Sequence, residues 1–311
     1  MNSFYMLTKR NTKLFFKDKG MFFCSLITPL ILLVLYVTFL GNAFKQTFVS
    51  VLPSELNISQ NIIDGLAGGQ LFASLLAVCC VTVAFCANML MVQDKYTGAR
   101  KDLLITQLKK SKLALSYYVA TFVCTFIICI VATLACFIYL AVVGWYMSFL
   151  DCLIIFFDVL LLTLFGTVLS SLVNYFLNTQ GQVSAVSGIV SSMYGFVCGA
   201  YMPIATFGVG IQKVLMFLPS TYASSLIKNH TLNGALTALK DSGIPTTVIE
   251  QIKDSIDCNL YIGGNQVDIG VCYAIVIATI VALIGVYVLI NVIKTKSTKT
   301  NKKQLEQTNQ N

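Results

Sequence analysis

Residues 69–92 read GQLFASLLAVCCVTVAFCANMLMV, a run of 24 residues without a charged side chain. An α-helix rises about 1.5 Å per residue, so about 20 apolar residues cross the hydrocarbon core of a bilayer. In lipid every backbone N–H and C=O group needs a partner within the protein, and a helix supplies these partners internally. The run therefore predicts a membrane-spanning helix.

Five other runs along the chain have the same character. Strands of a membrane β-barrel alternate apolar and polar residues, and these runs do not. The predicted fold class is therefore all-α, a polytopic membrane protein with six transmembrane helices. The expected spans are about 21–40, 69–92, 113–143, 152–176, 183–202 and 269–293.

The composition agrees with this fold class. Of the 311 residues 57% are apolar and 11% are charged, whereas a soluble domain has about 25% charged residues. All of the 11 cysteines except Cys258 lie in or beside the apolar runs, where a thiol behaves as a small hydrophobe. Without a CxxC pair or clustered histidines, we expect no disulfide scaffold and no metal or haem site.

The distribution of positive charge predicts the orientation. Segments 1–20, 93–112 and 294–311 hold five, six and five basic residues, which is 16 of the 21 in the chain. With six spans these segments share one side of the membrane, and the positive-inside rule makes that side the cytoplasm. We expect a multi-pass protein of the bacterial plasma membrane with both termini cytoplasmic. A cleaved signal peptide is the alternative for the first run, although that run and its polar leader are unusually long.

The basic segments also suit attraction to anionic membrane lipid. We expect no nucleic-acid partner, because no binding fold remains outside the spans. Residues 1–20 predict an amphipathic interfacial helix, with apolar residues such as Leu7 and Leu14 near helical spacing; a disordered basic leader is the alternative. Residues 21–293 form the expected transmembrane domain, and 294–311 form a cytoplasmic basic tail.

Two segments are expected on the outer side. Residues 41–68 predict a polar loop. Residues 203–267 predict a larger extracytoplasmic segment, which begins with a re-entrant hairpin over 203–218 because that stretch is short and broken by glycines. Its second part, about 233–257, predicts two short helices separated by Gly243-Ile244-Pro245.

The sequence gives no support for an enzyme. It contains no GxxxxGK(S/T) phosphate-binding loop and no Ser-His-Asp, Cys-His or HExxH arrangement, so we expect no catalytic residue and no cofactor bound by this chain. The single histidine, His230, falls in the predicted outer segment, and we expect it to be solvated.

Some polar and small residues lie within the apolar runs. Asp158 is the one acid well inside a span, and an acid in lipid is costly unless it faces protein or water. It is either part of a polar translocation cavity or a hydrogen-bonded structural acid. Small residues every four positions let helices approach closely, either within the subunit or at a cavity wall or subunit seam: Ser187, Ser191, Gly195 and Gly199.

The inner loop 93–112 reads QDKYTGARKDLLITQLKKSK. Asp102 is placed to cap a turn that precedes a short apolar group formed by Leu103, Leu104, Ile105 and Leu108. A short helix with an apolar tip and a basic surround suits docking to a cytoplasmic partner; lying flat on the membrane is the alternative.

At this loop the sequence resembles the type-2 ABC exporter permeases, the six-span membrane subunits of ATP-driven exporters. In that family the loop between spans two and three forms a coupling helix with an acid, a Ser/Thr-Gly pair and an acidic-Leu-Leu run. The matching residues are Asp94, Thr97-Gly98 and Asp102-Leu103-Leu104, with Leu108 in the same loop, and the usual proline that follows is missing. A second match follows span five, with Gly199, Met202-Pro203 and Leu218-Pro219-Ser220-Thr221-Tyr222 flanking a re-entrant stretch.

The resemblance implies a dimer with a second copy or a sister permease, joined to two ABC ATPase subunits that hold ATP and Mg²⁺. Spans two and five would line the seam between the permeases. Family substrates are drugs, peptides, lipids or polysaccharides, so the predicted function is efflux of an amphiphilic substrate, of the multidrug or bacteriocin export type. The alternatives are an ion-gradient-driven secondary transporter or channel, for which buried charged relays are typical, and a membrane enzyme or structural membrane protein.

Overall fold

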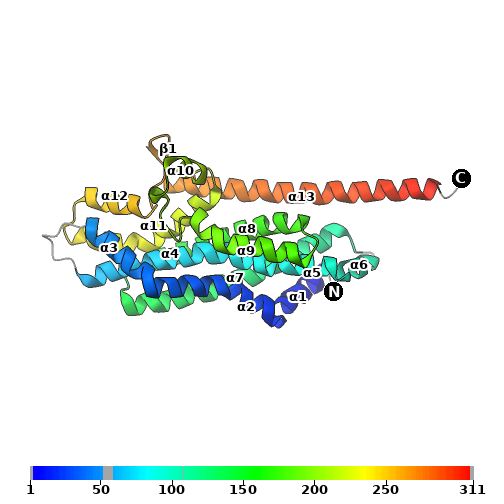
Figure 1. Cartoon of the computed structure of the whole chain (residues 1–311), viewed down its shortest axis with the longest axis horizontal. Helices are drawn as coiled ribbons and strands as arrows, with labels where there is room; N and C mark the ends of the chain where they lie inside the picture. Colours follow the sequence, from blue (N-terminus) through cyan, green and yellow to red (C-terminus); the bar gives the residue numbers. More distant parts are fainter. Residues whose placement is uncertain (1–2, 52–58, 107, 309–311) are drawn as a thin grey trace.

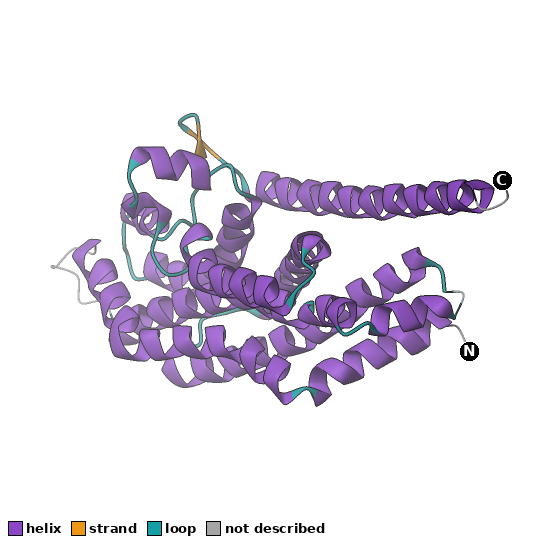
Figure 2. Cartoon of the chain, turned by 45° about the vertical axis from the view of Figure 1, so that its right-hand side comes forward, coloured by secondary structure: helices purple, strands orange, loops and turns teal. Residues whose placement is uncertain are grey.

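A bundle of long helices forms the protein, and the computed structural model describes residues 3–51, 59–106 and 108–308 (Figure 1). The N-terminus, the short helix α6 and the C-terminus lie at one end of the bundle, and α3 and α12 lie at the other. Figure 2 shows the same helices with one small strand pair beside them. The elements are α1 (Ser3–Lys17), α2 (Lys19–Leu35), the π-helix η1 (Tyr36–Leu40), α3 (Gly41–Val51), α4 (Gln60–Ala87), α5 (Met89–Tyr96), α6 (Ala99–Ile105), α7 (Lys110–Val143), α8 (Phe149–Phe176), α9 (Gln180–Val197), the 3₁₀ turn η2 (Ile204–Thr206), α10 (Val209–Leu215), α11 (Pro219–Asp241), α12 (Thr246–Ser255), β1 (Tyr261–Ile262), β2 (Asn265–Gln266) and α13 (Ile269–Thr308).

Helices long and apolar enough to cross a membrane make the protein an all-α polytopic membrane protein. Among the described residues there are five such segments: Lys19–Ser50, Gln60–Tyr96, Lys110–Val143, Phe149–Phe176 and Ile269–Asn291. The remaining expected span, 183–202, corresponds to α9, which has 18 residues. Its glutamines and serines keep its hydropathy below that of the other five, so the count of six spans stays a prediction.

The first span is longer than its sequence predicted. α2, η1 and α3 follow one another without a break, and α4 begins at Gln60, so the prediction of an outer loop over 41–68 is wrong for most of its length; residues 52–58 lie outside the described part. Phe44 and Phe48 lie one turn apart on α3 and are both buried. Lys45 forms a 2.6 Å ion pair with Asp64 of α4. These contacts extend the helix past the polar residues after Gly41.

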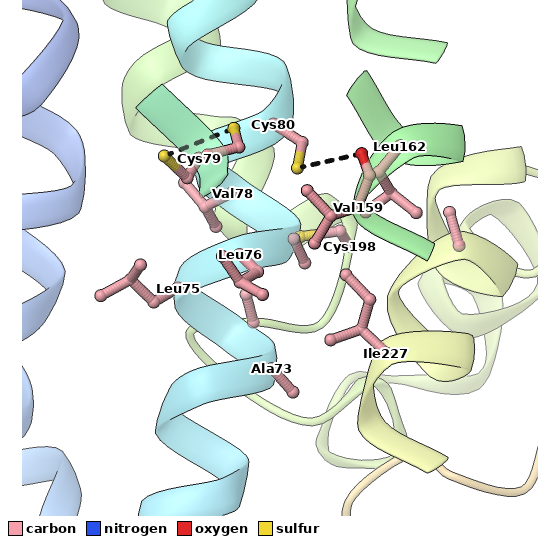
Figure 3. Close-up of a cluster of buried hydrophobic side chains, with 14 of the residues drawn as sticks. Ala73, Leu75, Leu76, Val78, Cys79, Cys80, Val159, Leu162, Cys198 and Ile227 are labelled. Carbon is pink, nitrogen blue, oxygen red and sulfur yellow. Dashed lines mark hydrogen bonds between the residues drawn. The ribbon is translucent and has the colours of Figure 1, made fainter. Parts of the chain in front are cut away.

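Helix α4 is the centre of the bundle. Its most apolar window is 94% buried, and it packs against α2, α7, α8, α9 and α11. Figure 3 shows Cys79 and Cys80 of α4 among side chains from neighbouring helices, including Val159 of α8 and Ile227 of α11. A helix surrounded in this way has little surface left for a subunit seam, although the resemblance implied such a role for span two.

Helix α11 also differs from its prediction. The predicted break at Gly243-Ile244-Pro245 is confirmed, because α11 ends at Asp241 and α12 begins at Thr246, but the first of the two helices starts at Pro219 and has 23 residues. Leu226, Ile227 and Leu232 are buried, and α11 packs against α4, α8 and α13. Because its buried face is rich in serine, alanine and threonine, its mean hydropathy is low and its place in the core was not recognisable from composition.

Close packing of α8 on α4 depends on Gly166. A Cβ atom at this position would lie 2.5 Å from the backbone oxygen of Cys80. We expect Gly166→Ala to lower the free energy of unfolding by about 1–3 kcal/mol through overpacking, measured as a lower melting temperature of the purified protein. Gly188→Ala is the control, because nothing lies within 4 Å of its added Cβ. Equal melting of the two variants would contradict this packing.

Candidate functional site

An apolar groove of about 1110 Å³ runs between the first span and α9. Ile27, Ile31 and Leu35 of α2 line one wall, and the opposite wall carries serines of α9. Among the described residues that line it there is no aspartate, glutamate, lysine or arginine. The groove therefore offers apolar surface and hydroxyl groups, and it has no charged side chain for a ligand.

The small residues of α9 take different roles. Ser187 and Ser191 line the groove, whereas Gly195 and Gly199 do not. Gly195 accommodates the ring of Tyr201, which lies where a side chain would be. Gly199 has a φ of +68° and ends the helix, and the N–H of Ala200 donates to the carbonyl of Gly195 at 2.8 Å, as in a glycine-terminated helix.

Asp158 is separate from the groove, so the structure does not place it in that cavity. Its side chain is buried, and it accepts hydrogen bonds from Tyr273 Oη of α13 at 2.5 Å and from His230 Nδ1 of α11 at 2.6 Å. This matches the second reading of Asp158, a hydrogen-bonded structural acid. The expectation of a solvated His230 is wrong, because α11 is a bundle helix and turns the imidazole towards α8.

Sequence reasoning missed a second buried polar group, formed by Lys228 and Asp257. Lys228 is 0% exposed, and its Nζ donates to the carbonyl of Gly199 at 2.9 Å and to Asp257 at 3.2 Å. Asp257 also accepts from the N–H of Ile204 at 2.9 Å. The pair fixes the chain just after α9. The sequence signal is a lysine that directly follows Leu226 and Ile227, within a segment predicted to be extracytoplasmic.

Pro203, Pro219 and Tyr222, which were predicted to flank a re-entrant segment, lie before η2 and in the first turn of α11. Pro203 precedes the 3₁₀ turn η2, and Pro219 occupies the first turn of α11, where a missing N–H costs nothing. Tyr222 Oη donates to the carbonyl of Met216 at 2.6 Å, and Thr221 Oγ1 donates to that of Leu215 at 2.7 Å. The Pro-Ser-Thr-Tyr sequence thus satisfies the free carbonyls at the end of α10.

The loop between α4 and α7 folds as two short helices, α5 and α6. Asp94, at the end of α5, is 4% exposed and is bound by Arg10 of α1 at 2.7 Å and by Tyr117 Oη of α7. Hydrogen bonding to Asp94 raises the pKa of Arg10 above its ordinary value. Asp94 was predicted to take part in coupling to an ATPase. Its carboxylate is already occupied within the subunit, so it positions the loop and does not face outwards.

Lys95 joins the same loop to α8. Its Nζ donates to the carbonyls of Asn174, Tyr175 and Leu177 at 3.1, 2.6 and 2.8 Å. A cation at the carboxyl end of a helix satisfies free carbonyls and suits the helix dipole. Adjacent residues thus connect α5 to α1 and α7 on one side and to α8 on the other.

Helix α6 follows α5, which Asp94 and Lys95 hold against the bundle. Gly98 has a φ of +88°, a conformation that glycine adopts readily, and Thr97 Oγ1 donates to the carbonyl of Gln93 at 2.8 Å. Asp102 lies exposed in the first turn of α6. Of the four apolar residues predicted to form the docking surface, Ile105 is 79% exposed, whereas Leu103, Leu104 and Leu108 are partly buried against the bundle.

The family comparison agrees with this arrangement of helices. The family model described as ABC-2 type transporter matches residues 2–229. The chain belongs to this family of ABC transporter membrane proteins, and the model describes the transmembrane component and not the ATPase. No curated protein and no solved structure matches the chain. The family membership favours an ABC transporter permease over a secondary transporter or channel and over a membrane enzyme.

The Arg10–Asp94–Tyr117 group allows a direct test of the loop support. Asp94→Asn removes the charge that holds Arg10, and we expect the loss to cost about 1–3 kcal/mol of unfolding free energy, as for other buried hydrogen bonds to charged groups. Asp102→Asn is the matched control, because Asp102 is exposed. Thermal melting of both purified variants measures the difference. Destabilisation by Asp102→Asn of the same size would show that the buried pair has no special role.

Proposed function

We propose that this chain is the permease subunit of an ABC exporter and moves an amphiphilic substrate out of the cytoplasm or the inner leaflet. A separate ATPase subunit would supply the energy. The apolar groove between α2 and α9 carries the proposal, because it is large and lined by hydroxyl groups and apolar side chains. Such a surface fits a substrate with an apolar body, such as a drug, a lipid-like molecule or an apolar peptide of the bacteriocin type.

The walls of the groove support a dimer. Both walls expose apolar side chains away from α4, including Phe23 and Leu30 of α2, at 62% and 57%, and Ile189 and Met193 of α9, both at 58%. A second permease, either another copy or a sister chain, would cover these surfaces and close the groove into a central pathway. In this arrangement the seam involves spans one and five, while α4 stays inside each subunit.

Two ATPase subunits, one for each permease, would bind at α6 and hold ATP and Mg²⁺. Movement of α6 would pass to the bundle through the two neighbouring connections of α5, Asp94 to α1 and α7 and Lys95 to α8. Asn88 separates α4 from α5, and its side chain bonds to Ser170 and Ser171 of α8. ATP can change the equilibrium between permease conformations only through contacts that differ between them, and α6 offers such a contact.

The proposed topology has six spans, with α9 as the fifth. The ends of the chain and α6 would face the cytoplasm of a bacterial cell, with the basic residues of segments 1–20, 93–112 and 294–311 on that side. The region from α10 to β2 would face outwards, and α1 would lie at the inner membrane surface.

A charge at the tip of α6 tests the docking role. We expect Ile105→Asp to reduce substrate-stimulated ATP turnover of the reconstituted permease–ATPase complex by about tenfold, because burial of a lone carboxylate in an interface costs at least 1–2 kcal/mol. Ile262→Asp is the control, since Ile262 is an exposed apolar residue of β1 at the other end of the molecule. Full turnover and transport by Ile105→Asp would exclude α6 as the coupling contact.

A bulky residue in the groove tests the translocation role. Gly188 lines the groove and has nothing within 4 Å of an added Cβ, so Gly188→Leu adds bulk to the groove from a position where a side chain can start without a clash. We expect it to reduce substrate export by about tenfold while the melting temperature is unchanged. Gly181→Leu is the matched control on the same helix, because Gly181 is equally open and lies outside the groove. Normal export by Gly188→Leu would place the substrate pathway elsewhere.

A further inference from the structure

A second cavity, of about 480 Å³, lies at the end of the bundle opposite α6. It is separate from the groove, and its walls come from the first turns of α8 and α13, from the second half of α11 and from α12. The lining side chains include Leu150, Ile154, His230, Lys240 and Ile269. We propose that this outer pocket binds a membrane amphiphile whose headgroup carries a phosphate diester and a hydroxyl group.

Among the charged side chains that line the pocket, Lys240 is the cation that can bind an acidic ligand. Asp151 is occupied by Asn233 at 2.9 Å and by Ser148, and Glu250 is occupied by Lys253 at 3.0 Å and Asn259 at 2.8 Å. Within the described part of the chain, Lys240 is exposed and has no ion-pair partner. The carboxylates are thus internally satisfied, and the ammonium group of Lys240 is free to bind an acidic group.

His230 supplies the second polar contact. Its Nδ1 is held by Asp158, which in turn accepts from Tyr273. Because Nδ1 is engaged by Asp158, Nε2 is the ring nitrogen left to bond a hydroxyl group, which can either donate or accept a hydrogen bond. The rigid connection through Asp158 to α8 and α13 fixes the imidazole at the pocket wall. The ammonium group of Lys240 and the imidazole of His230 together match a phosphate and a neighbouring hydroxyl group.

The apolar side of the pocket points to a lipid and not to a soluble phosphate. Leu150 and Ile269 are 64% and 44% exposed, and both begin helices that contain candidate membrane spans. They continue the pocket onto the surface that faces the hydrocarbon chains. An amphiphile can therefore place its headgroup on Lys240 and His230 and its chains along Leu150, Ile154 and Ile269.

Helix α12 relates this pocket to the groove. Ile249, Glu250 and Lys253 of α12 line the pocket, whereas Ser255 and the next residue, Ile256, line the groove. Occupancy of the pocket would fix α12 from one side and thereby affect the groove wall on the other. The binding itself requires neither an ATPase nor transport, so its failure leaves the proposed function untouched.

Lipid retention tests the proposal on the full-length protein. The purified chain is placed in phosphatidylcholine nanodiscs with a small share of phosphatidylglycerol, and the lipids retained after extraction are measured by native mass spectrometry. We expect selective retention of phosphatidylglycerol and about tenfold weaker binding in Lys240→Gln, because charge-assisted hydrogen bonds are strong. Lys213→Gln, at an exposed lysine of α10 outside the pocket, should bind as the wild type does. Absence of selectivity, or equal losses in both variants, overturns the proposal.

Two ligand comparisons test the contact between His230 and a hydroxyl group, and whether the bound phosphate belongs to a lipid or to a soluble anion. Phosphatidylmethanol has the phosphate diester without the hydroxyl groups, so it should bind more weakly than phosphatidylglycerol; equal binding overturns the role of His230 without any change to the protein. In the second comparison inorganic phosphate is added to lipid-free protein. Failure of millimolar phosphate to bind supports a membrane amphiphile. Binding of phosphate that depends on Lys240 assigns the pocket to a soluble anion and overturns the lipid assignment.

Discussion

The structure depends on the close approach of neighbouring helices to α4. Lipid chains are as apolar as leucine side chains, so burial of apolar surface alone does not bring transmembrane helices together, and packing and hydrogen bonds must do so. Glycines supply the close contacts: Gly166 of α8 faces the α4 backbone at Cys80, and Gly69 of α4 faces Leu232 of α11. Because α4 contacts helices on every side, the other helices take their positions from it.

Polar groups then fix the positions that packing leaves free. Three buried polar groups join elements that are not consecutive in the sequence: Asp158 joins α8, α11 and α13, Lys228 joins α11 to the end of α9, and Asp94 joins α5 to α1 and α7. Such groups are costly when unpaired in a medium of low dielectric constant. Their satisfaction therefore favours one arrangement of helices over shifted alternatives.

The two ends of the molecule differ in construction. At one end, a short helix is supported by Asp94 and Lys95 and exposes a single large apolar side chain, Ile105. At the other end, α12 packs on α11 and contributes residues to both the groove and the outer pocket. In the proposed mechanism a movement at α6 would pass through α5 to α1, α7 and α8, and a ligand in the outer pocket would act on the groove wall through α12.

The sequence by itself determined the class of the protein, the boundaries of α7 and α8 to within a few residues, and the family. Long uncharged runs and clustered basic residues are local signals, because each span satisfies its own backbone hydrogen bonds. Only the tertiary structure decided that α11 is a core helix, that His230 pairs with Asp158 and that Ile105 is the exposed residue of α6. These depend on which helices become neighbours. A polar helix such as α11 is stabilised by contacts with segments distant in sequence, which hydropathy along the chain does not register.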